Sequence, residues 1–179
     1  MQNLKAKLRA ATADDHRRTE ASFAAFLVAL PDSYGGFLQA HARAFPAIGC
    51  ALSAAIDWPA WRARWRDLES DLAAFDLDPP PTLTVTAAAS RAEALGMAYV
   101  LEGSRLGSTL LLARIPAGMP RAYLRGGNDR APWRQLLALL ETIDPQDEAG
   151  AIAGAGKAFR AFRAATAFEP CTRALELTP

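Results

Sequence analysis

Cysteine and histidine are both scarce in this chain, which has two of each among its 179 residues. Cys50 and Cys171 are far apart and are not spaced as metal ligands. We therefore expect neither a disulfide framework nor a cysteine-based metal site, and a reducing compartment fits. The chain also has no Glu-x-x-His pair, so a di-iron carboxylate site in a helical bundle is excluded.

A dominant sign of charge and long apolar runs are also missing. Lys and Arg number 20 against 19 Asp and Glu, for a net charge of +1, and no basic block stands out. This balance argues against nucleic-acid binding through phosphate contacts. Apolar stretches such as 23–30 are far shorter than the roughly 20 residues that cross a bilayer, and the first residues do not have the layout of a signal peptide. We expect a cytoplasmic protein that binds neither membrane nor nucleic acid.

Strand-like alternation is nearly absent and is limited to 82–86, a short segment that follows three prolines. The rest of the chain has helical periodicity, and its length suits one domain. We predict an all-α fold: a single-domain multi-helix bundle over 1–179, in which the last eight or so residues are frayed. A loop with at most one helical turn is expected at 119–129, and a bend at Pro46. The expected helices cover 4–30, 37–56, 60–75, 86–115, 131–143 and 146–168.

The first histidine lies on a distinctive stripe of the first predicted helix. At about 100° per residue, six side chains fall within about 40° of His16. They are Lys5, Arg9, Thr12, Glu20, Phe23 and Leu27. A neutral imidazole is a good ligand for haem iron, the nearby Glu20 carboxylate can orient the ring, and Arg9 lies at a suitable distance for a haem propionate. The alternative is a solvated, amphipathic helix on which His16 makes ordinary surface contacts.

The fourth predicted helix contains three glycines, at spacings of seven and four, on a single face. They are Gly96, Gly103 and Gly107, and Arg114 shares their face. Each glycine inside a helix costs about 0.8–1 kcal/mol relative to alanine. Such a face lets the backbone approach either a flat ligand or another helix, and both interpretations stay open. The hydroxyls of Ser104 and Ser108 could hold ordered water or bond back to the helix carbonyls.

Segments 8–20 and 99–108 together resemble the haem oxygenases, the biliverdin-producing enzymes, in their bacterial branch. The first segment has Thr four residues before His16 and Glu four residues after it, as around the proximal histidine of the family. The second contains the string Glu-Gly-Ser-x-Leu-Gly at 102–107, which is similar to the distal helix of the bacterial members.

This resemblance implies that haem b lies between a proximal helix, from which His16 ligates the iron, and a glycine-kinked distal helix. It implies a haem oxygenase that cleaves haem with O2 and reducing equivalents to biliverdin, CO and Fe2+. Haem is then both substrate and prosthetic group, and a ferredoxin- or reductase-type donor supplies the electrons. The product could feed a biliverdin-binding photoreceptor, or the reaction could serve haem catabolism and iron release.

The resemblance also assigns roles to individual residues. Gly103, Ser104 and Gly107 would form the catalytic distal face, and His16, Glu20 and Arg9 would bind the haem. Three further cations are chosen mainly for their geometry as haem contacts: Arg114, Lys157 and Arg160.

The sequence departs from the family pattern at two positions. Ser104 stands where mammalian members have a catalytic aspartate, and Ser108 stands where many members have a further glycine. These departures motivate an alternative, a non-catalytic haem carrier or sensor on the same scaffold. A third hypothesis is a helical interaction protein without haem. Among the other residues, Trp133 is expected to be a packing residue, while Tyr99 could face either the core or the haem edge. His41 could be a distal hydrogen-bonder, but an ordinary core or surface histidine is favoured.

Overall fold

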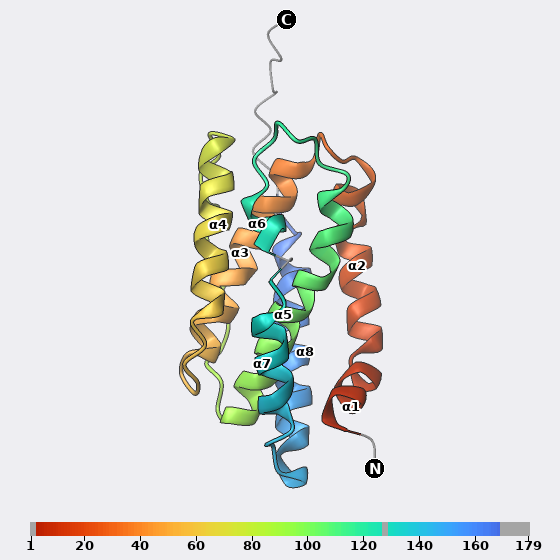
Figure 1. Ribbon diagram of the computed structural model, residues 1–179, viewed down its shortest axis with the longest axis vertical. Helices are drawn as coiled ribbons and strands as arrows, with labels where there is room; N and C mark the ends of the chain where they lie inside the picture. Colours follow the sequence, from red (N-terminus) through yellow and green to blue (C-terminus); the bar gives the residue numbers. More distant parts are fainter. Residues whose placement is uncertain (1–2, 127–128, 169–179) are drawn as a thin grey trace, which may run out of the picture.

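The computed structural model describes residues 3–126 and 129–168. All regular structure within these residues is helical, which confirms the all-α prediction (Figure 1). The α-helices are α1 Leu4–Ala11, α2 Ala13–Val28, α3 Tyr34–Leu52, α4 Ala60–Ala74, α5 Arg91–Leu112, α6 Ala122–Arg125, α7 Ala131–Leu140 and α8 Glu148–Ala165. A 3-10 turn, Pro145–Asp147, precedes α8. The predicted fraying of the last residues lies outside the described part of the chain.

The first predicted helix is interrupted, so the expectation of one helix over 4–30 is wrong. Thr12 leaves the helical conformation, at φ −104° and ψ 7°, and separates α1 from α2. Its hydroxyl donates to the Leu8 carbonyl at 2.8 Å, a back-bond that weakens and bends helices. Asp14 and Asp15 then lie in the first turn of α2, where the helix dipole favours negative charge.

The helix α5 begins five residues later than predicted, at Arg91. Ser90 caps it: the Ser90 hydroxyl accepts from the Glu93 N–H at 3.2 Å, and the Glu93 carboxylate accepts from the Ala89 N–H at 2.6 Å. This is a capping arrangement of the Ser-x-x-Glu type, which ties the start of the helix to that point. The preceding residues, including 82–86, form no strand; the Leu83 N–H instead donates to the Arg43 carbonyl of α3.

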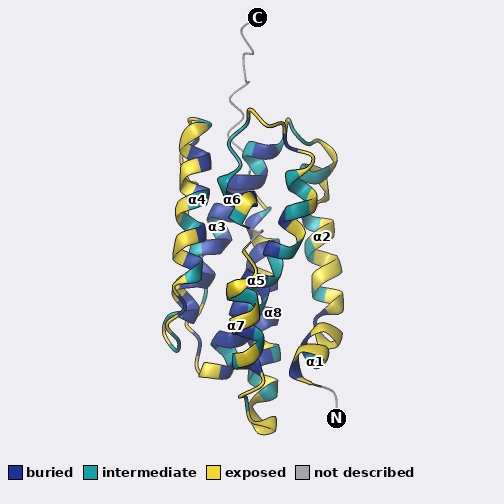
Figure 2. Cartoon of the chain, in the orientation of Figure 1, coloured by how far each residue is buried: buried dark blue, intermediate teal, exposed yellow. Residues whose placement is uncertain are grey.

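The interior is formed by α3, α5 and α8, while α2 and α4 have one face toward solvent (Figure 2). The helices α5 and α8 share the most extensive contact in the molecule. A Cβ on Gly96 would lie 1.9 Å from the Ala151 carbonyl oxygen, and one on Gly154 would lie 2.0 Å from that of Glu93. Close helix packing therefore explains Gly96. None of the described helices is long and apolar enough to cross a membrane.

Candidate functional site

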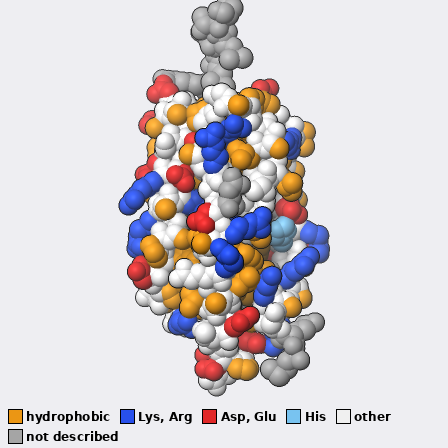
Figure 3. Space-filling model, viewed as in Figure 1, with side chains coloured by type: hydrophobic (Ala, Val, Ile, Leu, Met, Phe, Trp, Pro, Cys, Tyr) orange, Lys and Arg blue, Asp and Glu red, His pale blue; other side chains and the backbone are white. Residues whose placement is uncertain are grey.

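A cavity of about 780 Å³ lies between α2 and α5 and extends inward to α3, α4 and α8. Figure 3 shows this face hollowed, with hydrophobic side chains inside and Lys and Arg side chains around the opening. A volume of this size is typical of pockets for small molecules and cofactors. The cavity is therefore the candidate functional site.

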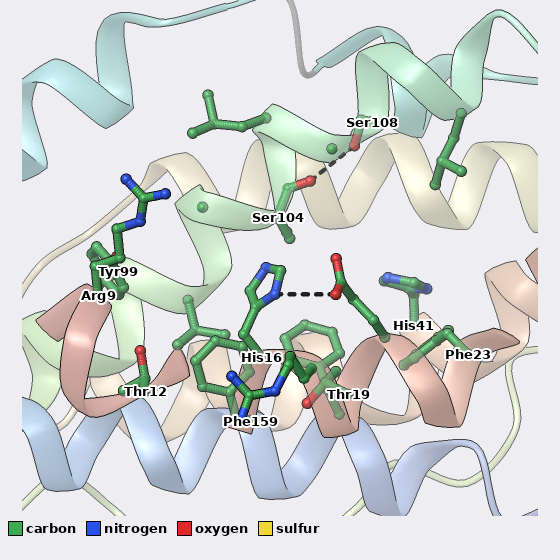
Figure 4. A pocket seen from close by; sticks show the side chains of 18 of the residues that line it. Arg9, Thr12, His16, Thr19, Phe23, His41, Tyr99, Ser104, Ser108 and Phe159 are labelled. Atoms are coloured by element: carbon green, nitrogen blue, oxygen red, sulfur yellow. Dashed lines mark hydrogen bonds and ion pairs between the residues drawn. The ribbon is translucent and has the colours of Figure 1, made fainter. Parts of the chain in front are cut away.

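The wall on the α1–α2 side is the stripe of side chains predicted around His16. All seven of its residues line the cavity, in the order Lys5, Arg9, Thr12, His16, Glu20, Phe23 and Leu27. The break at Thr12 does not rotate this face away from the cavity. The stripe gives the cavity a basic end and an apolar end: Arg9 lies beside Tyr99 at one end, and Phe23 beside His41 at the other (Figure 4).

The His16 ring lies near the middle of this wall. Its Nδ1 is 3.5 Å from a Glu20 carboxylate oxygen, and the ring forms a T-shaped contact with Phe159, at 5.9 Å between ring centroids. A carboxylate beside Nδ1 favours the tautomer that carries its proton there and leaves Nε2 with a free lone pair. The ring lies between α2 and the Ser104 segment of α5 (Figure 4), so the imidazole can ligate a metal held in the cavity.

The opposite wall contains the other two glycines of α5. A Cβ on Gly107 would meet no atom within 4 Å, and one on Gly103 would meet only the Trp133 ring at 3.9 Å. Helix packing thus explains Gly96 but gives no reason for Gly103 or Gly107, both of which line the cavity. Helix packing is therefore confirmed at Gly96, while the close approach of a flat ligand stays a prediction for Gly103 and Gly107.

Behind this wall lies Arg64, a residue that the sequence analysis did not single out. It is 2% exposed and lines the cavity from α4. Its Nη1 donates to the Ser104 hydroxyl at 2.7 Å and to the Leu101 carbonyl at 2.8 Å, and its Nη2 lies 3.4 Å from the Ser108 hydroxyl. Burial lowers the pKa of Arg64, yet an arginine remains charged at neutral pH. The available signal was an arginine on the apolar face of a helix, one turn before Leu68.

His41 is buried, which excludes the surface position, and it lines the deep end of the cavity. Its Nδ1 lies 2.9 Å from the Phe37 carbonyl and therefore carries a proton, so that Nε2 is an acceptor. Burial, which outweighs the hydrogen bond to Phe37 and is assisted by the nearby Arg64 charge, lowers the pKa of His41 to about 3. The imidazole is therefore neutral, and it is packed among the rings of Phe23, Phe37, Tyr123 and Phe162.

Tyr99 and Trp133 form an aromatic pair, with ring centroids 5.5 Å apart, at the basic end. Both line the cavity, so Tyr99 faces the cavity, and the packing of Trp133 lies at the cavity wall. Burial raises the pKa of Tyr99, and the nearby Arg9 opposes this shift.

The predicted cations fall into two groups. Arg9 lines the cavity, as does Lys5, and neither forms an ion pair within the described residues. Arg114, Lys157 and Arg160 are not among the lining residues. Lys157 pairs with Glu93 at 2.5 Å, Arg160 is exposed on α8, and Arg114 donates to the Leu27 carbonyl across the apolar end.

Comparisons with known proteins agree with this fold. No family model matches the chain, and no curated protein matches its sequence. Among solved structures, the chain is similar to the NO- and CO-bound heme oxygenase from Neisseria meningitidis, with a TM-score of 0.69 over 99% of both chains at 22% identity. The chain therefore has the fold of that protein, and the predicted haem oxygenase-like architecture is confirmed.

Proposed function

We propose that this protein is a haem oxygenase, which binds haem b in the cavity and cleaves it to biliverdin, CO and Fe2+. One observation carries the proposal: His16 on α2 lies across the cavity from a stretch of α5 whose two glycines have no packing partner that would require them. A flat ligand coordinated by His16 explains why side chains are missing on the facing wall. Electrons would come from a ferredoxin- or reductase-type donor.

The cavity suits an amphipathic macrocycle with anionic substituents on one edge. Phe23, Leu27 and Phe159 provide apolar contacts. Lys5 and Arg9, which form no ion pair with other described residues, provide positive charge at the other end. Haem propionates would meet these two cations, and the ring would lie along the apolar remainder. Arg114, Lys157 and Arg160 are not needed for this placement.

Bound haem would supply the oxidative chemistry, and the protein would supply binding, orientation and the surrounding polarity. The His16 Nε2 would ligate the iron, and Glu20 would hold the imidazole in the required tautomer. The bare backbone at Gly103 and Gly107 would allow α5 to approach the ring closely. Ser104, fixed by Arg64, would present the nearest hydroxyl on that side.

A second candidate is a haem carrier or sensor without turnover. The observation in its favour is that the hydroxyls of Ser104 and Ser108 donate to helix carbonyls, at 2.7 and 3.2 Å. The carboxylate of Glu102, two residues before Ser104 on α5, accepts hydrogen bonds from Trp58 and Arg105. Among the described residues, α5 thus contributes no carboxylic acid to the lining of the cavity.

Haem titration followed by reduction in air separates these functions. An oxygenase gives a stoichiometric Soret band that decays into the broad red absorption of biliverdin, whereas a carrier keeps the band. His16→Ala should lose the normal ferric spectrum and most turnover. Arg18→Ala is the matched control, because Arg18 lies on the same helix, pairs with Asp14 and does not line the cavity. A normal spectrum in His16→Ala would refute the assignment.

A further inference from the structure

The turn of α2 that carries His16 has little apolar anchoring of its own. The helix begins directly after the break that follows α1, and its N-cap side chain bonds back into α1. Of residues 13–20, only Asp15 and Thr19 are not exposed. The first buried side chain of α2 is Phe23, about two turns after His16. Apolar packing alone therefore does not fix the position of His16, and the polar contacts of this turn become important.

Both of the half-buried residues in this turn contact one arginine of α8. The Arg163 Nη1 lies 2.9 Å from the Asp15 carboxylate, 3.3 Å from the Asp15 carbonyl and 3.4 Å from the Thr19 hydroxyl. The Thr19 hydroxyl donates to the same carbonyl at 2.8 Å. A contact to the carboxylate alone would leave the backbone free to shift, because the Asp15 side chain can rotate. The bond to the carbonyl ties the main chain of this turn to α8.

The α8 residues that face this turn lie on one stripe of the helix. They are Gly156, Phe159 and Arg163, at spacings of three and four. Phe159 makes the T-shaped contact with the His16 ring, and Figure 4 shows it between the ribbon of α8 and that ring. A Cβ on Gly156 would lie 3.7 Å from an Asp15 carboxylate oxygen, so the bare backbone of α8 comes close at this point. The same stripe of α8 thus contacts the His16 ring and the backbone that carries it.

We propose that Arg163 is a positioning residue for His16. Its contacts with Asp15 and Thr19, here called the α8 clamp, hold the turn against α8 and set how far the His16 Nε2 reaches into the cavity. Arg163 is not among the residues that line the cavity, so it acts through α2. The clamp belongs to the haem-free protein. Only the identity of the group that His16 binds, the haem iron, rests on the proposed function.

Amide hydrogen exchange in the haem-free protein tests the clamp directly. Arg163→Ala should speed exchange at residues 16–20 about threefold or more, because local opening no longer breaks these bonds. Lys7→Ala is the matched control: Lys7 joins α1 to α8 through a partly buried ion pair with Glu148 and does not line the cavity. Asp15→Asn removes only the charge and should act in the same direction, so it tests the clamp even if Arg163→Ala fails to fold. Exchange at 16–20 as slow in both clamp variants as in Lys7→Ala would overturn the proposal.

The iron–histidine stretching band of the ferrous haem-loaded protein tests whether the clamp acts on the ligand. Arg163→Ala should shift or broaden this resonance Raman band and weaken haem binding about threefold or more. Arg163→Lys should restore most of both, because an ammonium group can still donate to Asp15. Lys7→Ala should leave the band unchanged. An unchanged band in Arg163→Ala would overturn the positioning role and leave Arg163 as a link between two helices. If the wild-type protein binds no haem, the proposed function fails, and hydrogen exchange still decides the clamp.

Discussion

Gly107→Ala should strengthen the fold and weaken haem binding at the same time. The added Cβ meets no atom within 4 Å in the haem-free protein, so it creates no clash. Replacing glycine by alanine inside a helix stabilises it by about 0.8–1 kcal/mol. For a protein of this size, that gain raises Tm by roughly 2–4 °C. The methyl group nevertheless points into the cavity, where a ring ligated by His16 would contact α5.

The assay pairs thermal unfolding of the haem-free protein with haem titration and turnover. We expect a higher Tm together with about a tenfold or greater loss in haem affinity or turnover, because the macrocycle must move to avoid the methyl group. Two other glycines calibrate the result. Gly118→Ala also meets no atom, but lies in a loop outside the cavity and should leave haem binding unchanged. Gly96→Ala would bring its Cβ within 1.9 Å of a backbone oxygen and should destabilise the fold.

Wild-type haem affinity and turnover in Gly107→Ala, with the expected gain in Tm, would refute the reasoning. It would show that the ligand does not approach α5 at this point. If Gly107→Ala lowered the Tm instead, the added methyl group would have to clash with a neighbour that the haem-free structure does not place near Gly107. A stability gain with a binding loss is explained only by a ligand that uses the bare backbone.

Three further predictions use other parts of the site. Lys5→Ala and Arg9→Ala should each weaken haem binding several-fold at low ionic strength and less at 0.5 M salt, because salt screens exposed charges. Haem titrations at both salt concentrations check this, and a loss that does not depend on salt would contradict it. Because the pKa of His41 is lowered in the folded protein, only the unfolded chain gains this proton as the pH falls below about 6.5. The free energy of unfolding should therefore be highest above about pH 6.5 and be lower by about 2 kcal/mol at pH 5. Urea unfolding at both pH values should show this difference, and the His41→Gln variant should lack it. Arg64→Met should lower Tm more than Arg62→Met, since Arg62 is exposed and Arg64 is fully buried and hydrogen-bonded; similar melting temperatures would contradict the structural role given to Arg64.

The helical architecture and one wall of the site were predictable because both depend on local periodicity. The stripe around His16 was assigned by counting residues around a helix, and its seven members do line the cavity even though Thr12 interrupts the helix. The interruption itself was missed because it depends on one back-bonded hydroxyl. The late start of α5 was missed although Ser90 and Glu93 carry a recognisable capping pattern.

The opposite wall could not be predicted from local pattern, because its properties come from contacts between helices. Arg64 is 37 positions from Leu101 in the chain, and only the packing of α4 on α5 brings its guanidinium under Ser104. The same applies to the glycines: an identical residue on the same face of α5 packs against α8 at Gly96 and faces an open cavity at Gly107. Periodicity assigns residues to a face of a helix, whereas the neighbour on that face decides their role. For this protein, the position of the Ser104 hydroxyl is thus fixed by a buried cation from another helix.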